Sequence, residues 1–139
     1  MTQEDKELLL KDLCARLPYG VRISLEYKNK HLEGTLDAVY PIEDDRVIID
    51  NLSEAIAYCN VRCGGFHIEE NNIKPYLFPL LSMTEEQLSY YVTTLKYSEE
   101  TRVMVETLDS FDWLNKNHFD YRGLIEKGLA IDATGKNIY

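Results

Sequence analysis

Large aromatic side chains gather in residues 111–125 of this 139-residue chain. The stretch holds the only tryptophan, Trp113, and two of the four phenylalanines, together with a tyrosine, a histidine and an arginine. Aromatic side chains supply the largest buried areas both in protein cores and in interfaces. We therefore expect this stretch either to form a core around which the chain packs or to form an interface with a partner.

The first nineteen residues predict a helix. Thr2 and Asp5 have the spacing of a capping box, with Asp in place of the usual Glu. Pro18 then ends the helix, because proline cannot continue its hydrogen bonding. Apolar side chains recur at the spacing that places them on one helix face, namely Leu10, Leu13, Cys14 and Leu17.

Residues 20–79 predict a small β-rich part. Polar and apolar residues alternate over 21–27 and over 32–40, on either side of a polar turn at 28–30. This is the pattern of an antiparallel hairpin. Gly34 within the second run predicts a bulge or a sharp bend, of the kind that curls a sheet into a small barrel.

The remainder of the β-rich part gives weaker signals. Residues 46–50 and 66–68 predict short strands. Alternation favours a strand over 57–63, although residues 52–58 also fit a turn of helix. The prolines of 73–79 favour an extended segment, either an edge strand or a crossing over the sheet.

Residues 80–139 predict a helical part. Thr84 and Gln87 form a capping box for a helix whose apolar face consists of Leu88, Tyr91, Val92 and Leu95. A second helix is expected over 98–117, and the alternative is two helices, of which the later one is capped by Ser110. Taken in order, the elements predict a single α+β domain over 1–139.

This domain is expected to have three parts. An N-terminal helix occupies residues 1–19, and a small, strongly bent antiparallel β-sheet or partial barrel occupies residues 20–79. C-terminal helices occupy residues 80–139.

The formal net charge of −9 narrows the classes of function. Acidic residues are concentrated at 43–45 and along 84–112, and no segment supplies the basic surface that phosphate binding requires. Nucleic-acid binding is therefore disfavoured. The acidic excess either keeps the protein soluble or provides an acidic face, for a basic partner or as a mimic of nucleic acid.

The chain has the features of a cytoplasmic protein. No run of eighteen apolar residues predicts a membrane span, and the polar N-terminus lacks the apolar region of a signal peptide. Three cysteines, an odd number without a secretion signal, argue against a disulfide framework. We therefore expect a cytoplasmic location and no contact with a membrane.

Cys59, Cys63 and His67 form the most metal-like pattern of the chain. Zinc sites need three or four such ligands that converge on a tetrahedron. The usual two-residue spacing between cysteines is absent here, and no fourth ligand is evident. Ordinary strand residues fit the pattern as well. We predict no metal and no other cofactor, since the glycine motifs that bind phosphate are also absent.

His118 and Asp120 have the residue types for general acid–base catalysis, because imidazole titrates near neutrality and a carboxylate can orient it. Local structure explains the same two residues. His118 would end a helix at the negative end of its dipole, and Asp120 would cap the next turn. No second catalytic cluster faces them, so we predict neither catalytic residues nor enzyme activity.

Protein interaction is the remaining use for the aromatic residues. Tyrosine is plentiful, at ten of 139 residues. It is enriched at interfaces because one end is apolar and the other is polar. The candidate interaction residues come from the aromatic stretch and from the helix before it, namely Trp113, His118, Asp120, Tyr121, Arg122, Tyr90 and Tyr91.

The C-terminal run resembles a known group of proteins. Its motifs are WLN at 113–115, HFDYRGLI at 118–125 and GLA at 128–130. They are similar to the ending of small uncharacterised proteins encoded in prophages and mobile elements of Bacteroides-type bacteria. Residues 13–21, and residues 73–77 leading into 82–86, are similar to the same group. The group carries no assigned activity, so the resemblance implies a mobile-element context and no catalytic residues.

The leading hypothesis is therefore a non-enzymatic protein-interaction protein of a prophage or mobile element, with an unidentified protein partner. An acidic inhibitor or nucleic-acid mimic is a special case of it. The second hypothesis is nucleic-acid binding by the small barrel, since such folds hold oligonucleotides. It requires that Arg22, Lys28, Lys30 and Arg46 cluster with exposed tyrosines, and that affinity falls steeply with salt. The third is a small enzyme that uses His118 and Asp120.

Overall fold

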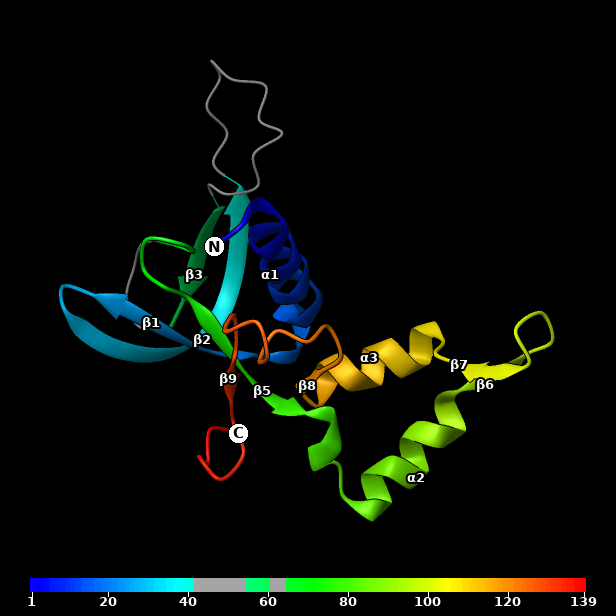
Figure 1. Ribbon diagram of the computed structural model, residues 1–139. Helices are drawn as coiled ribbons and strands as arrows, with labels where there is room; N and C mark the ends of the chain where they lie inside the picture. The colour runs from blue at the N-terminus through cyan, green and yellow to red at the C-terminus, as the bar shows by residue number, and fades with distance from the viewer. Residues whose placement is uncertain (42–54, 61–64) are drawn as a thin grey trace.

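The computed structural model describes residues 1–41, 55–60 and 65–139. In these ranges the chain forms a seven-stranded sheet, a separate two-stranded sheet and three α-helices (Figure 1). The strand order of the larger sheet is β4-β3-β2-β1-β5-β8, and β9 also pairs with β5. The predicted α+β class is confirmed, and the sheet, as far as it is described, is not closed into a barrel.

The elements follow the order of the chain. The α-helices are α1 (Gln3–Arg16), α2 (Glu85–Thr94) and α3 (Leu108–Lys116), and the short 3-10 turns are η1 (Leu17–Tyr19) and η2 (Leu80–Ser82). The strands of the larger sheet are β1 (Arg22–Tyr27), β2 (Lys30–Pro41), β3 (Ala55–Cys59), β4 (Gly65–His67), β5 (Lys74–Pro79), β8 (Phe119–Asp120) and β9 (Ile131–Asp132). The smaller sheet pairs β6 (Lys96–Ser98) with β7 (Val103–Val105). The strand predicted over 46–50 lies outside the described residues.

Helix α1 begins at the predicted capping box. Thr2 Oγ1 accepts the Asp5 backbone N–H at 3.1 Å, and the Asp5 carboxylate accepts the Thr2 N–H at 3.3 Å. The buried face differs from the predicted one and consists of Leu9, Asp12, Leu13 and Arg16. Cys14 is exposed, and Leu10 and Leu17 are partly buried. The prediction was wrong because it used apolar residues alone, whereas the helix turns a charged pair inward.

Strands β1 and β2 form the predicted hairpin. Lys28 and Asn29 make a two-residue turn with φ values of 50° and 61°. A type I′ turn requires such left-handed values at both positions, and its twist matches that of the flanking strands.

The irregularity in β2 lies at a different place from the predicted one. Gly34 pairs regularly with β1, whereas the register with β3 shifts between Leu36 and Ala38. A one-residue shift exchanges the two faces of a strand. Beyond it, Val39 packs against the core and Tyr40 is 60% exposed.

Strand β5 lies inside the sheet and is not the predicted edge strand or crossing. It pairs antiparallel with β1 and parallel with both β8 and β9, so the sheet is mixed and not antiparallel throughout. The prediction relied on the missing N–H of proline. The residues between the prolines supply the bonds: the Phe78 N–H donates to the His118 carbonyl at 2.8 Å, and the Leu77 carbonyl accepts the Ala133 N–H at 2.8 Å.

The part of the chain after β5 is not helical throughout. The helix predicted over 98–117 is wrong, because the β6–β7 hairpin precedes α3, which begins at Leu108. Thr107 caps α3: its Oγ1 accepts the Ser110 N–H at 3.3 Å, and Ser110 Oγ accepts the Thr107 N–H at 3.0 Å. The two-helix alternative is also wrong in its first helix and its cap, since Ser110 is the third residue of α3 and does not precede it.

The main core lies between α1 and the larger sheet, and the segment after α3 packs against it. Its fully buried members include Leu9, Leu13, Ile23, Leu25, Leu77 and Leu124. Helix α2 and the β6–β7 hairpin extend to one side of this body (Figure 1). We call residues 80–111 the arm. No helix in the described part of the chain combines the length and the apolar character that a membrane span needs.

Candidate interaction site

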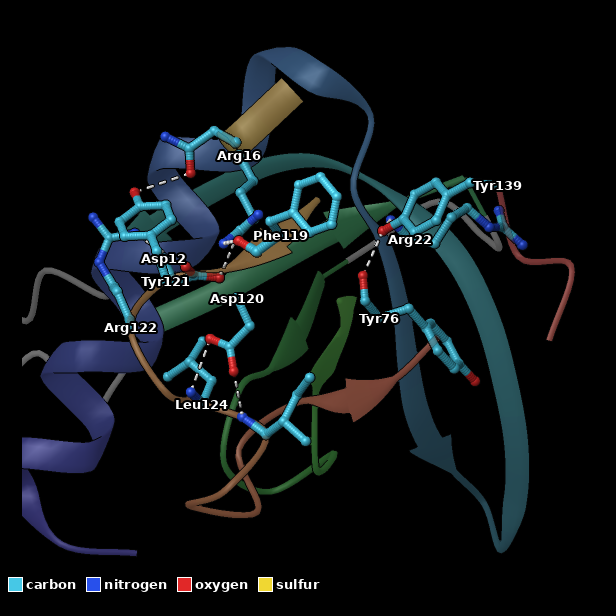
Figure 2. A network of polar contacts seen from close by, with 12 residues as sticks. Asp12, Arg16, Arg22, Tyr76, Phe119, Asp120, Tyr121, Arg122, Leu124 and Tyr139 are labelled. Atoms are coloured by element: carbon cyan, nitrogen blue, oxygen red, sulfur yellow. Dashed lines mark hydrogen bonds and ion pairs between the residues drawn. The ribbon is translucent and has the colours of Figure 1, made fainter. Parts of the chain in front are cut away.

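A buried ion pair within α1, between Asp12 and Arg16, is hydrogen-bonded to the segment that follows α3 (Figure 2). The Arg16 Nε donates to Asp12 Oδ2 at 2.9 Å, and Arg16 Nη2 donates to the Phe119 carbonyl at 2.6 Å. Both charged side chains are fully buried. Arg122 Nη1 donates to the other Asp12 oxygen at 3.0 Å, so one carboxylate holds two guanidinium groups. These contacts fix residues 119–122 against α1.

Tyr121 and Arg122, two of the candidate interaction residues, contribute to this packing. The centre of the Tyr121 ring lies 4.6 Å from the guanidinium carbon of Arg122 and 5.5 Å from that of Arg16. Cations are attracted to the face of an aromatic ring. The Tyr121 hydroxyl donates to Asn115 Oδ1 at 3.0 Å. Both candidates are half-buried, so they stabilise the fold at the edge of the core.

Asp120 caps the turn that follows β8, in agreement with the local-structure interpretation. Its two carboxylate oxygens accept the backbone N–H groups of Leu124 and Ile125, each at 2.9 Å (Figure 2). The residue is also buried. Because both oxygens are engaged, this carboxylate is occupied as a cap and does not orient an imidazole.

His118 stacks on Tyr139, with ring centroids 3.7 Å apart and an interplanar angle of 9°. Burial, followed by the charge of Arg16, lowers the pKa of His118 from its ordinary value of 6.5 to about 4. Its Nδ1 is buried, and no described residue forms a hydrogen bond with it. The structure therefore brings His118 and Asp120 into neighbouring positions without the hydrogen-bonded dyad that the enzyme hypothesis requires.

The Tyr139 hydroxyl bridges β1 and β5 (Figure 2). It accepts the Arg22 N–H at 2.9 Å and donates to the Tyr76 carbonyl at 2.7 Å. The direct pairs between these strands join Ile23 to Pro75 and Ser24 to Lys74. The hydroxyl thus adds a side-chain link between β1 and β5 next to those backbone pairs. Burial raises the pKa of Tyr139 to about 12, which keeps this hydroxyl a proton donor.

Trp113 connects the arm to the core through a series of ring contacts. Its ring stacks on Phe119 at 5.6 Å and on Tyr91 at 6.0 Å, and Tyr90 lies against it at 5.6 Å between ring centroids. Phe119 is buried, Trp113 is half-buried and Tyr90 is 55% exposed. Trp113 therefore links a buried ring of the aromatic stretch to an exposed ring of α2.

The arm exposes most of the large apolar side chains that the described residues leave uncovered. Of fourteen such residues, ten lie in the arm: Leu80, Leu81, Leu88, Tyr90, Val92, Tyr97, Val103, Met104, Leu108 and Phe111. Helix α2 contains no buried residue, although it carries the predicted apolar pattern. Concentrations of exposed apolar side chains are typical of interaction sites.

A pocket of about 530 Å³ opens between α2 and α3. Its lining combines three aromatic rings, two carboxylates and one ammonium group, from Tyr19, Tyr90, Trp113, Asp109, Asp112 and Lys116. Threonine side chains complete the lining. We call this the α2–α3 pocket.

Hydrogen bonds fasten the end of α2 to the start of α3. The Thr94 carbonyl accepts from Thr107 Oγ1 at 2.9 Å and from Ser110 Oγ at 3.0 Å. Ser110 is fully buried. Together with the stacking of Tyr91 on Trp113, these bonds hold the two walls of the α2–α3 pocket in place.

The metal-like pattern includes Cys63 and the basic cluster includes Arg46, and both residues lie outside the described ranges. The other two residues of the metal-like pattern are described: Cys59 is buried in β3 and His67 is exposed in β4. The described ranges contain no group of three His, Cys, Asp or Glu side chains that could hold a metal. Arg22, another member of the predicted basic cluster, donates from its Nη1 to Thr35 Oγ1 at 2.9 Å.

Of the residues that the sequence offered as interaction candidates, Tyr90 and Trp113 line the α2–α3 pocket and Tyr91 stacks on Trp113. The sequence analysis did not predict the β6–β7 hairpin, and it did not name Asp109 or Asp112. A signal for the hairpin is present, because β-branched residues alternate strictly through Thr101, Val103, Val105 and Thr107. Asp109 and Asp112 carry no comparable signal, since first-turn and surface acids are common on helices.

Comparison of this chain with protein-family models, curated proteins and solved structures finds no match. Function must therefore be inferred from the chemistry of the described residues.

Proposed function

We propose that this chain is a non-enzymatic protein-interaction protein whose arm binds a protein partner. The observation that carries the proposal is the concentration of exposed apolar side chains on the arm. Each of them costs free energy in contact with water, at roughly 25 cal/mol per Å² of apolar surface. A partner that covers them would recover that free energy on binding.

The build of the arm also supports this role. An element that served only the fold would bury its apolar face, whereas α2 buries none of its residues. Two capping boxes and the Thr94 hydrogen bonds keep the arm ordered without such burial. A surface that is ordered before binding loses less entropy when a partner docks on it.

Two polar residues of the aromatic stretch support binding over catalysis. Asp120 is engaged as a cap, and His118 is neutral over the physiological pH range because of its lowered pKa. The resemblance of 113–130 to proteins of prophages and mobile elements supports a role in such an element. An acidic inhibitor or a nucleic-acid mimic remains a special form of this proposal.

A capture experiment tests the proposal. The immobilised chain is incubated with lysate of the host cell, with and without nuclease, beside two double variants. The arm variant carries Leu88→Ser and Val92→Ser at exposed positions of α2. The control variant carries Tyr40→Ser and Tyr58→Ser, which remove an exposed aromatic pair from the larger sheet.

We expect a protein that is captured by the wild type and the control variant, survives nuclease treatment and is lost from the arm variant. Polar substitutions at exposed positions change stability little, so the arm variant should remain folded. Capture that vanishes with nuclease would favour the nucleic-acid hypothesis instead. Equal capture by wild type and arm variant would contradict a binding role for the arm.

A further inference from the structure

The α2–α3 pocket lies in the most acidic part of the described chain. Residues 84–112 contain seven acidic and two basic side chains. Asp109 and Asp112 line the pocket, and neither forms an ion pair with any described residue. Their charges are therefore free to attract a cation from outside the chain.

The aromatic lining suits the same kind of ligand. The stacking of Trp113 on Phe119 and Tyr91 holds its ring as a fixed wall. Tyr90 is 55% exposed and offers ring surface to the pocket. An ammonium or guanidinium group gains from contact with such a ring, and the aliphatic stem of lysine or arginine packs on it.

Net charge also distinguishes two possible occupants of the arm, a second copy of this chain and a basic segment of another protein. A second copy of this chain would bring a net charge of −9, and the same acidic segment, against an acidic surface. Like charges in one interface oppose association. A basic segment of another protein meets both the apolar side chains and the acids.

We propose that the α2–α3 pocket binds a lysine or arginine side chain, presented by a basic, partly apolar segment of the partner protein. This inference rests on the proposed function and adds the chemistry of the partner. The stem of the basic side chain lies against Tyr90, and its charged end reaches Asp109 and Asp112. Neighbouring apolar residues of the same segment cover the exposed side chains of α2.

Trp113 gives a direct readout of the pocket, because it is the only tryptophan of the chain and lines the site. The test is a fluorescence titration of the full chain with two synthetic peptides. One is a capped octapeptide of alternating lysine and leucine, and the other has glutamate in place of lysine. Titrations at low and high salt measure the ionic part of binding.

Three variants test the assigned roles. The double variant Asp109→Asn with Asp112→Asn should weaken binding of the lysine peptide about five- to tenfold, from two lost exposed ion pairs. Tyr90→Leu should weaken it about threefold, since the cation–aromatic attraction is lost and an apolar group is kept. Lys116→Gln should strengthen it about twofold, because a like charge leaves the pocket.

A matched control carries Glu26→Gln and Glu126→Gln. It changes the net charge by the same amount at exposed positions outside the pocket. We expect it to bind the lysine peptide within about twofold of the wild type, because distant exposed charges are screened. Thermal melting of each variant checks that the fold is retained.

Several results would overturn the inference. They are equal binding of the two peptides, no binding of the lysine peptide, and equal weakening in the control and pocket variants. A dimer of the free chain that Tyr90→Leu dissociates in sedimentation would show that a second copy fills the pocket. Leu88 and Val92 lie outside the pocket lining. If the arm variant loses lysate capture but the wild-type chain does not bind the lysine peptide, this inference is rejected and the proposed function is retained.

Discussion

The pairing of Asp12 with Arg16 explains how two charges are kept in the core of a small protein. Removing each ion from water costs several kcal/mol, and the cost is recovered only with good geometry and further hydrogen bonds. Here the carboxylate receives two guanidinium groups, and Arg16 also donates to the Phe119 carbonyl. Nη1 of Arg16 finds no hydrogen-bond partner among the described residues, so part of the cost is not recovered.

Breaking this pair should be strongly destabilising. Asp12→Asn keeps the shape but leaves a buried guanidinium charge without its counter-ion, and we expect a loss of about 3–5 kcal/mol in the free energy of unfolding. Urea denaturation measures it. Asp37→Asn, at an exposed position of β2, is the control and should change stability by less than about 0.5 kcal/mol. A loss below about 1 kcal/mol for Asp12→Asn would contradict this role of the pair.

His118 predicts a specific dependence of stability on pH. Its pKa is about 4 in the folded protein and 6.5 in the unfolded chain, so the unfolded state binds more protons between these values. Stability should therefore fall as the pH is lowered from 6.5 towards 4. His118→Phe keeps a ring on Tyr139 and removes the titration, so its unfolding free energy should vary less with pH across this window. Parallel curves for wild type and variant would refute the assignment.

At the scale of elements, two chemically equivalent helix caps should have different effects. Thr2 caps α1, which is packed in the core, and Thr84 caps α2, which buries no residue. Thr2→Ala should lower the free energy of global unfolding by about 1 kcal/mol, the usual loss of a cap. Thr84→Ala should mainly lower the protection of α2 amides against hydrogen exchange, because α2 can open without unfolding the body. Equal global losses would show that α2 is coupled to the core.

Local chemistry explains which elements could be predicted. The capping boxes at Thr2 and Thr84 and the hairpin turn at Lys28 and Asn29 depend on neighbouring residues only, and the structure contains all three. The N-terminal helix and the α+β class followed from these signals. They needed no information about residues distant in the chain.

The predictions failed where residues distant in the sequence determine the local structure. The buried face of α1 depends on Phe119 and Arg122, which lie more than a hundred positions away, and β5 becomes an interior strand because β8 and β9 reach it. No periodicity within α1 or β5 contains that information. The prediction of Asp120 as a cap succeeded because its partners are four and five residues away.

At the scale of the whole molecule, the Tyr139 hydroxyl ties the end of the described chain to its first strand. Tyr139→Phe keeps the stacked ring but leaves the Arg22 N–H and the Tyr76 carbonyl without this partner. We expect a loss of about 1–3 kcal/mol in unfolding free energy. Tyr58→Phe, which alters an exposed ring, is the matched control and should be close to neutral. Unchanged hydrogen exchange of the Arg22 amide in Tyr139→Phe would contradict the bridging role.

The place of β5 between strands from opposite ends of the chain also has a kinetic consequence. The β1–β2 hairpin closes over a two-residue turn, whereas the bond from Arg16 to Phe119 spans 103 positions and that from Arg22 to Tyr139 spans 117. Contacts between distant residues slow folding, because the chain must lose the entropy of a long loop before they form. The rate of folding should therefore be set by the slow step that brings residues 119–139 to β5, and the hairpin should form long before that step.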